Sequence, residues 1–398
     1  MYLLEVLDTA KIVNDPVHGF VRLPAGRVLK VLSHPIVQRL RRISQLGLAH
    51  FVYPGATHTR FLHALGVMHL ADEALSILSR KGVKLSKETW EAVLLAALLH
   101  DIGHSPFSHS LEKYILPLSH EEIGYACLSL LEDSVGTLTE VRSLWEGDHP
   151  LTFLCELIAS QLDVDRLDYL VRDSFFTGVQ EGLVGTERLI HTMTVVNNHL
   201  VVEEKGQNSA EKFIVTRRFM YWQVYLHKGV LGAEWLLQRW WRAMEVAAPP
   251  FFLESRKKLS EQGIPYFLRI DESTLWGWIH YGVESDFLPL RVLSRALLER
   301  IPYKLRPIVE QESYLERERW LNSLSPHLRP WWEWFWAEGW AESKAYEPSS
   351  GKDIYILTKG GDVKALVELS PWLPALNEPM RRFFAGGIPA AFLEWLSR

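Results

Sequence analysis

The sequence predicts a mainly α-helical protein with a short N-terminal β-hairpin and a smaller C-terminal α+β lobe. Residues 61–80 and 88–101 carry apolar side chains at the three- and four-residue spacing of a helix face. Residues 11–24 instead alternate β-branched residues with turn formers, which is typical of a hairpin. A late run, residues 353–357, has the composition of a strand and is followed by a turn over residues 359–362.

The hairpin comes first, with turn signals at Asn14–Asp15–Pro16 and His18–Gly19. From about residue 34 to residue 240 we expect mostly helices. Within this region, Val195–Val196 and Leu200–Val202 flank a polar turn and predict a pair of short strands.

The helix expected over residues 88–101 contains the segment WEAVLLAALL, which is apolar on every side. A helix without a polar face is buried all round, so we place it at the centre of the core. Gly103 and Pro106 should end it, which would put His100 and Asp101 in its last turn.

Two further signals delimit the later elements. Residues 119–122, Ser-His-Glu-Glu, form a capping box, so His120 should begin a helix. Pro249–Pro250 interrupt the helical pattern, and we place a domain boundary near there. The predicted domains are a core over residues 1–245 and a C-terminal lobe over residues 246–398.

Composition limits the class of protein. With 398 residues, 47% of them hydrophobic, the chain can bury a large core. The net charge of −5 provides no basic field for nucleic acid or an anionic membrane, so phosphate binding must rely on a few placed cations. No stretch reaches about 18 uninterrupted apolar residues, so we expect no membrane span.

The N-terminus lacks the basic segment of a secretory signal. Both cysteines, Cys127 and Cys155, lie in apolar segments and are predicted to be buried free thiols. Together these features predict a cytoplasmic protein. The sixteen tryptophans are unusual, and a late group of them predicts an aromatic-packed lobe or a subunit interface: Trp320, Trp331, Trp332, Trp334, Trp336 and Trp340.

Three segments carry the residues that hold metals: HTRFLHALGVMHLA (58–71), LLHDIGHSPFSH (98–109) and QLDVDRLDYLVRD (161–173). From them we select His63, His100, Asp101 and Asp165 as a metal site. Two imidazoles and two carboxylates suit a borderline divalent ion such as Fe, Mn, Zn or Co, which the sequence does not distinguish. Burying these groups without a partner would cost on the order of several kcal/mol.

Polar residues at helical spacing accompany the metal set. Arg60 precedes His63 by three residues and shares its face. Asp165, Tyr169 and Asp173 follow at intervals of four, as do Arg217, Tyr221 and Tyr225 further on. The second row fits cations for phosphate and aromatic rings for a sugar or base. Each row alone is equally compatible with a solvated or salt-bridged helix surface. The sequence contains neither a G-x-S-x-G nucleophile elbow nor a P-loop, so these two other types of catalytic site are not indicated.

These segments resemble the HD-domain superfamily of metal-dependent phosphohydrolases, and more narrowly its deoxynucleoside triphosphate triphosphohydrolases. The similarity runs from about residue 11 to 235 and includes KIVNDPVHG, QRLRRISQLG, YPGATHTRFLHALG, HDIGHSPFSH, SHEE, DVDRLDYLVRD and TRRFMYWQVYLHK in the family's order. The resemblance implies a helical HD core that hydrolyses dNTPs to deoxynucleoside and inorganic triphosphate, with one divalent metal and a Mg ion on the substrate phosphates.

By position, the resemblance implies the same four metal ligands, with catalytic groups at His104, His109, His120 and Glu121. It implies that the substrate is bound by Gln45, Leu46, Arg60, Arg166, Tyr169, Asp173, Arg217 and Tyr225. Glu112 stands where the family usually has an aspartate.

The resemblance also bears on regulation. Lys11, Gln38 and Arg41 match an activating nucleotide site at a subunit interface, but Ser33 replaces the aspartate that reads guanine in the vertebrate enzyme with a sterile-alpha-motif domain. Guanine-specific activation is therefore in question, whereas a homo-oligomer with another nucleotide activator stays open. The alternative functions are another HD-type nucleotide phosphohydrolase or phosphodiesterase, or a nucleotide-sensing or nucleic-acid-binding protein without turnover.

Overall fold

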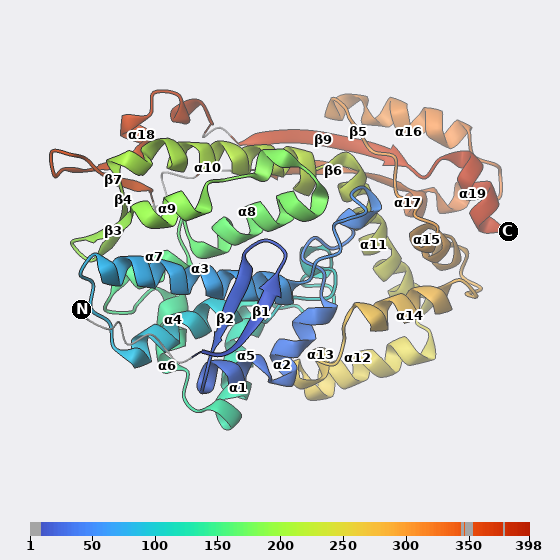
Figure 1. Cartoon of the computed structure of the whole chain (residues 1–398). Helices are drawn as coiled ribbons and strands as arrows, with labels where there is room; N and C mark the ends of the chain where they lie inside the picture. The colour runs from blue at the N-terminus through green and yellow to red at the C-terminus, as the bar shows by residue number, and fades with distance from the viewer. Residues whose placement is uncertain (1–8, 344–345, 347–352, 377–378) are drawn as a thin grey trace.

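The computed structural model describes residues 9–343, 346, 353–376 and 379–398. The chain is mainly helical, with a short N-terminal hairpin and small sheets formed largely by its later part, as the sequence predicted (Figure 1).

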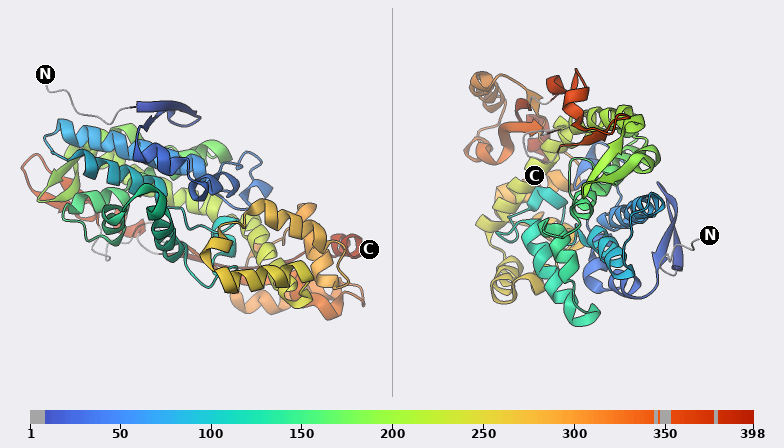
Figure 2. Two further views of the ribbon diagram at one scale, coloured as in Figure 1. Left: turned by 90° about the horizontal axis from the view of Figure 1, so that it is seen from below. Right: turned by 90° about the vertical axis from the view of Figure 1, so that its left-hand side faces the viewer.

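The hairpin joins β1 (Thr9–Asp15) to β2 (Gly19–Pro24). Asp15 closes its turn, because one carboxylate oxygen accepts hydrogen bonds from the amides of Val17 and His18, both at 2.9 Å. The hairpin lies on the outside of the helical core, beside α3 (Arg60–Arg80) (Figure 2).

Three helices provide the core of the site. α3 packs against the fully apolar α4 (Lys87–Leu99) on one side and against α8 (Val164–Thr177) on the other. The predicted capping box is present, and α5 (His120–Val135) begins at His120. The other helices before residue 245 are α1 (Arg27–Leu32), α2 (Pro35–Gln38), α6 (Thr139–Glu146), α7 (Thr152–Ile158), α9 (Thr186–Thr192) and α10 (Gln207–Met220).

The later helices follow α11 (Lys228–Ala247), which ends just before the predicted proline break. They are α12 (Pro250–Gln262), α13 (Ile264–Phe267), α14 (Glu272–Gly282), α15 (Leu288–Leu298), α16 (Ser313–Asn322), α17 (Trp332–Phe335), α18 (Leu366–Leu369) and α19 (Ala390–Ser397). The strands are β3 (Met193–Val196), β4 (His199–Glu203), β5 (Arg306–Pro307), β6 (Trp336–Ser343), β7 (Tyr355–Leu357), β8 (Val363–Ala365) and β9 (Met380–Gly387).

The sheets connect distant parts of the sequence. β3 and β4 form the predicted hairpin, with Asn197 and Asn198 at positive φ in its turn. The late strand β7 pairs in parallel with β4, so it extends that sheet, and β5, β9 and β6 make a separate one. Buried apolar side chains form one continuous cluster from Val21 to Leu396. The domain boundary near residue 245 stays a prediction.

Two helix ends differ from the expectation. The helix predicted over 88–101 ends at Leu99, so His100 caps it and Asp101 lies in the following turn. The row of Arg217, Tyr221 and Tyr225 is not one regular helix either, because α10 ends at Met220 and Tyr221–Tyr225 form a π-helical turn. Such turns shift side chains off the regular helical row and often occur at functional sites.

Other expectations concern burial. Cys127 and Cys155 are free and buried, as predicted. Within the described residues one helix, α3, is long and apolar enough to cross a membrane, but 72% of its apolar window is buried inside the fold. This helix also carries His63, so it serves as the central helix of the site.

Candidate metal centre and substrate pocket

The four predicted metal ligands converge from three parts of the chain. His63 comes from α3, His100 and Asp101 follow α4, and Asp165 lies in the first turn of α8. The Nε2 atom of His63 is 3.1 Å from Nε2 of His100 and 3.0 Å from Oδ1 of Asp165. Asp101 lies 3.7 Å from His63 and 3.4 Å from His100. Ligands at about 2.1 Å from one ion stand at such mutual distances.

Each imidazole of this set is held from behind. The Nδ1 atom of His63 is hydrogen-bonded to the carboxylate of Asp168 at 2.7 Å. The Nδ1 atom of His100 is hydrogen-bonded to the carbonyl oxygen of Ala97 at 2.8 Å. Both contacts turn Nε2 toward the ligand cluster, which is the usual support of a metal-binding histidine. The sequence pattern alone does not single out Asp168. It lies three residues after Asp165, and only the packing of α8 on α3 reveals its contact with His63.

Asp168 belongs to a fully buried ion-pair chain. Arg172 donates to Asp168 at 2.8 and 2.9 Å and to Asp15 of the hairpin turn at 2.8 Å. His18 also contacts Asp168, at 2.6 Å. The chain fits only because Gly66 of α3 has no side chain, since a Cβ there would lie 1.9 Å from Asp168 and 2.3 Å from Arg172.

The carboxylates and imidazoles of the predicted metal site together stabilise positive charge. Burial alone would lower the pKa of His63, but hydrogen bonds with Asp165 and Asp168 raise that pKa to about 10. Burial likewise opposes ionisation of Asp165, yet His100 and His63 hold the pKa of Asp165 well below its usual value. Three ionised carboxylates around two imidazoles favour a cation, and a divalent metal satisfies that preference better than a proton. The residues present therefore fit a metal.

Arg60 lies at the edge of this centre. Its guanidinium is buried, pairs with Asp101 and donates to the hydroxyl of Ser108 at 2.8 Å. Burial opposes ionisation of Asp101, but Arg60 and the nearby histidines hold the pKa of Asp101 well below normal. The ion pair with Asp101 keeps Arg60 beside the predicted metal ligands. A phosphate group bound there would contact both Arg60 and the ion.

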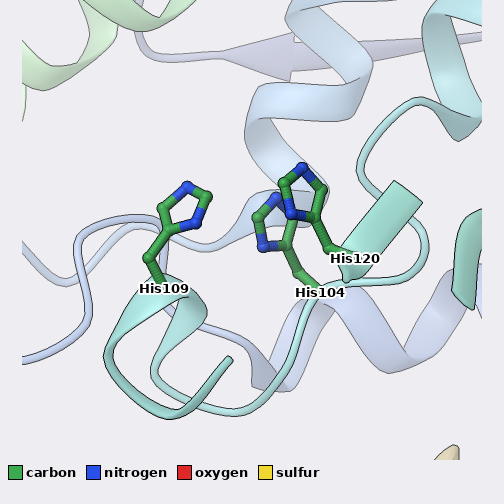
Figure 3. Close-up of side chains that lie close together, drawn as sticks. All are labelled: His104, His109 and His120. Carbon is green, nitrogen blue, oxygen red and sulfur yellow. The ribbon is translucent and has the colours of Figure 1, made fainter. Parts of the chain in front are cut away.

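Three histidines form a second cluster next to the metal ligands (Figure 3). His104 stacks on His120 with ring centroids 4.1 Å apart, and His109 meets both rings edge-on. His104 contacts Asp101 at 3.1 Å, while its Nδ1 atom is buried without a hydrogen-bond partner. Burial, together with the charge of Arg60, lowers the pKa of His104 well below its usual value.

Glu112 organises this cluster. Its carboxylate is 2.9 Å from Nδ1 of His109 and 2.8 Å from Nδ1 of His120. The hydrogen bond with His109, followed by that with His120, holds the pKa of Glu112 well below normal although partial burial opposes this. Glu121 contacts Nε2 of His120 at 3.2 Å, but its side chain is 62% exposed. The carboxylate of Glu112 thus contacts two histidines at once.

One pocket of about 390 Å³ joins these groups to an aromatic end. Asp101, Asp165 and the three clustered histidines line one part, and Gln45, Leu46, Tyr169, Asp173 and Tyr225 line another. Tyr225 donates to Asp173 at 2.8 Å, and the same carboxylate contacts His58 at 2.8 Å. The Oε1 atom of Gln45 is buried without a partner. Unpaired buried polar atoms facing a pocket indicate contacts made by a ligand.

Two predicted phosphate contacts stand outside the pocket lining. Arg166 pairs with Asp163, the buried N-cap residue of α8, and Arg217 makes a 3.4 Å contact with Gln161. Both guanidinium groups stand close to Tyr169, whose pKa burial raises. The Nε atoms of both side chains are buried without a hydrogen-bond partner, so each guanidinium keeps a free donor.

Sequence reasoning missed the support of the loop after α4. Glu272 of α14 accepts hydrogen bonds from the amides of Ser44 at 2.6 Å and Phe107 at 3.0 Å. The buried Arg39 donates to the carbonyl of His104 at 2.8 Å and also to Ile270. Phe107 and Ser108 both have positive φ, a conformation that costs energy unless neighbours enforce it. The segment around residue 270 thus fixes the loop that carries His104.

The predicted activator residues lie on the surface. Ser33 and Arg41 are exposed, and Arg41 contacts Gln38 at 2.8 Å and stacks over Phe61. None of these residues lines the pocket described above.

Comparison with known proteins agrees with this geometry. The HD domain model matches residues 60–172, and a model of the HD-associated region matches residues 184–246. The first match begins at Arg60 and contains all four predicted ligands. The chain belongs to the HD-domain phosphohydrolase family, whose members bind divalent metals.

A phosphohydrolase from Bacteroides thetaiotaomicron is 35% identical and superposes with a TM-score of 0.86 over 95% of this chain and 99% of that one. An uncharacterised Bacillus subtilis protein is 32% identical over 78% of this chain and 76% of its own length. The human deoxynucleoside triphosphate triphosphohydrolase SAMHD1 is 30% identical over 56% of this chain, which spans 42% of the human protein.

Proposed function

We propose that the protein hydrolyses deoxynucleoside triphosphates to deoxynucleoside and inorganic triphosphate in a metal-dependent reaction. One observation carries the proposal: three of the four proposed metal ligands, His63, Asp101 and Asp165, line the same pocket as a group of tyrosines that suits a sugar and base. The relatives named as deoxynucleoside triphosphate triphosphohydrolases support the substrate class.

The chain's residues would divide the work as follows. Arg60 stands beside the proposed metal ligands and would contact the phosphates, and Arg166 and Arg217 would add further cationic donors for the triphosphate. His63, His100, Asp101 and Asp165 would hold a divalent ion, which would supply Lewis acidity to the reacting phosphate when bound. We place Fe, Mn, Zn or Co at the quartet and a Mg ion on the substrate phosphates.

Proton transfer to the leaving 5′-oxygen falls to the histidine cluster. We favour His120, because Glu112 orients it, whereas the neutral His104 is tied to Asp101. His109 and Glu121 assist from the exposed side. Leu46 faces the sugar and disfavours a 2′-hydroxyl, since a buried unpaired hydroxyl costs about 1–3 kcal/mol.

We further propose a cytoplasmic homo-oligomer with a nucleotide activator bound near Lys11, Gln38 and Arg41. The exposed positions of Ser33 and Arg41 are compatible with a site between subunits. The exposed rings of Trp340, Trp372 and Trp395 offer apolar contacts for such an assembly.

The direct test incubates metal-loaded protein with each of the four dNTPs, with and without added nucleotides, and detects inorganic triphosphate. Production of triphosphate from at least one dNTP supports the proposal. Its absence under all conditions, while metal is bound, contradicts it. Cleavage of cyclic dinucleotides or nucleoside monophosphates in the same panel would point to another HD phosphodiesterase or phosphohydrolase, and saturable binding without turnover to a sensor.

Removing one ligand tests the metal assignment. Asp165→Ala should lose stoichiometric metal and at least about 10²-fold of activity, because the ion keeps only three of four ligands. Metal content by mass spectrometry is the readout. Asp133→Ala, an exposed change on α5, is the control and should retain both. Full metal occupancy in the Asp165 variant would remove that residue from the ligand set.

A further inference from the structure

Glu272 connects α14 to two segments that form the wall of the pocket. It is the first residue of α14, and the residue before it, Asp271, forms an ion pair with Arg42. The carboxylate of Glu272 accepts hydrogen bonds from the amide and the hydroxyl of Ser44 at 2.6 and 2.5 Å, and from the amide of Phe107 at 3.0 Å. Three donors on one carboxylate fix the segment at Ser44 and the loop at Phe107 relative to each other.

The hydrogen bonds continue from Ser44 to Arg60. The hydroxyl of Ser108 donates to the carbonyl oxygen of Ser44 at 2.5 Å and accepts from Nε of Arg60 at 2.8 Å. A hydroxyl has a single hydrogen to donate, so Ser44 sets the orientation of the Ser108 side chain. Ser108 and Arg60 are both buried, where hydrogen bonds in series strengthen one another. Glu272 is therefore connected to Arg60 through two serines.

The backbone around Ser44 supports Arg60 as well. Ser44 forms an isolated antiparallel bridge with Thr59, and the amide of Arg60 donates to the carbonyl oxygen of Ile43 at 2.9 Å. A displacement of Ser44 would consequently move both the main chain of Arg60 and the hydrogen-bond partner of its side chain.

The guanidinium of Arg60 has one nitrogen left for a ligand. Nε is held by Ser108 and Nη1 pairs with Asp101, whereas Nη2 forms no hydrogen bond within the described parts of the chain. Arg60 lines the pocket together with the predicted metal ligands His63 and Asp101. Because the guanidinium is planar and rigid, holding Nε and Nη1 also fixes the position of Nη2. A phosphate that binds there does not have to order this side chain.

We propose that Glu272 is a positioning residue that acts through Ser44 and Ser108 to hold the guanidinium of Arg60 in the orientation that receives a substrate phosphate. The inference rests on the proposed function, in which Arg60 contacts the phosphates. It gives a part in phosphate binding to a residue of α14 that does not itself line the pocket.

The first test measures the binding of inorganic triphosphate by calorimetry to protein loaded with Mn²⁺, at one free Mn²⁺ concentration throughout. Glu272→Gln should weaken this binding about tenfold, because an amide has one acceptor oxygen for the three donors that meet the carboxylate. Glu284→Gln, an exposed change just after α14, is the control and should bind triphosphate as the wild-type protein does. Unaltered affinity in Glu272→Gln overturns the inference.

A double-mutant cycle separates positioning of Arg60 from a general effect on the fold. If Glu272 acts through Arg60, Glu272→Gln should cause no further loss of triphosphate affinity in an Arg60→Ala background. Losses that multiply independently would mean that Glu272 does not act through Arg60, and they would overturn the inference.

Ser108→Ala tests the same connection without changing a charged group, and it decides the question if Glu272→Gln does not fold. It removes the acceptor of Nε of Arg60, so it should also weaken triphosphate binding about tenfold, and only when Arg60 is present. Unchanged affinity in this variant contradicts the inference.

The binding measurements also separate this inference from the proposed reaction. If no dNTP is hydrolysed while triphosphate binding follows the cycle, the reaction fails and the role of Glu272 stands. Failure of the wild-type protein to bind triphosphate would overturn the role of Glu272.

Discussion

At the scale of single residues, the proposed metal ligands were accessible from the sequence because the adjacent His100–Asp101 pair follows an apolar helix, where ionisable groups are costly to bury without a partner. Asp168 was not, because its contact with His63 depends on how α8 lies against α3. A pattern gives the spacing of side chains on one helix. It does not show which of two neighbouring carboxylates turns toward another helix.

Asp168→Asn should weaken metal binding about 10- to 100-fold, because the amide no longer orients the imidazole of His63 as a carboxylate does. It should also destabilise the fold by about 3–5 kcal/mol, since Arg172 stays buried with less compensation. Titration with metal and thermal unfolding measure the two effects. Asp15→Asn removes the other partner of Arg172 without touching His63, so it should share the loss of stability and keep the metal affinity.

Glu112 gives a prediction with a defined pH dependence. Its folded pKa is depressed, so its contribution to stability is present above the unfolded pKa of about 4.5 and is lost as the pH falls below that value. Glu112→Gln should therefore cost about 1–3 kcal/mol at pH 7 and progressively less below pH 4.5. Denaturant unfolding across this range measures the difference. A difference that grows toward acid pH would contradict the assignment.

At the scale of elements, helix interiors were predictable, as was the start of α5 at its capping box, but the end of α4 was not. Gly103 and Pro106 indicated where the helix must stop, but it ends at Leu99, before either residue. The π-helical turn at Tyr221–Tyr225 had no signal in the sequence, because its residues are ordinary helix formers or aromatics. This turn places Tyr225 where its hydroxyl reaches Asp173.

Close packing of α3 on α8 requires Gly66. Gly66→Ala should destabilise the protein by on the order of 1–3 kcal/mol or more, as overpacking of a buried site does, because the new methyl group overlaps Asp168 and Arg172. The same overlap should reduce the metal affinity. Gly124→Ala in α5 is the matched control. Its Cβ would meet only Trp145 and Ile102 at ordinary distances, so helix propensity predicts a gain of about 0.5–1 kcal/mol. Thermal unfolding of both variants checks the contrast.

At the scale of the whole molecule, the sequence indicated two domains but not how their elements combine. Parallel pairing of β4 with β7 joins strands about 150 residues apart along the chain, and local patterns contain no information on such partners. The same holds for Glu272 and Arg39, which tie the site loop to the segment near residue 270.

The continuous apolar cluster from Val21 to Leu396 predicts that the chain unfolds as one cooperative unit. Calorimetry should show a single transition, and tryptophan fluorescence should report the same midpoint as loss of bound metal. Two separated transitions would contradict this prediction and would instead support an independent lobe beginning near residue 245.

The hydrogen bonds that Glu272 accepts from Ser44 and Phe107 have a consequence for comparing relatives of different length. A protein that keeps the histidine-rich loop but lacks an equivalent of α14 must supply some other acceptor for those two amides. A chimera of the first 245 residues with an unrelated C-terminal segment would leave both amides without an acceptor. The loop would then lose the conformation that brings its imidazoles together.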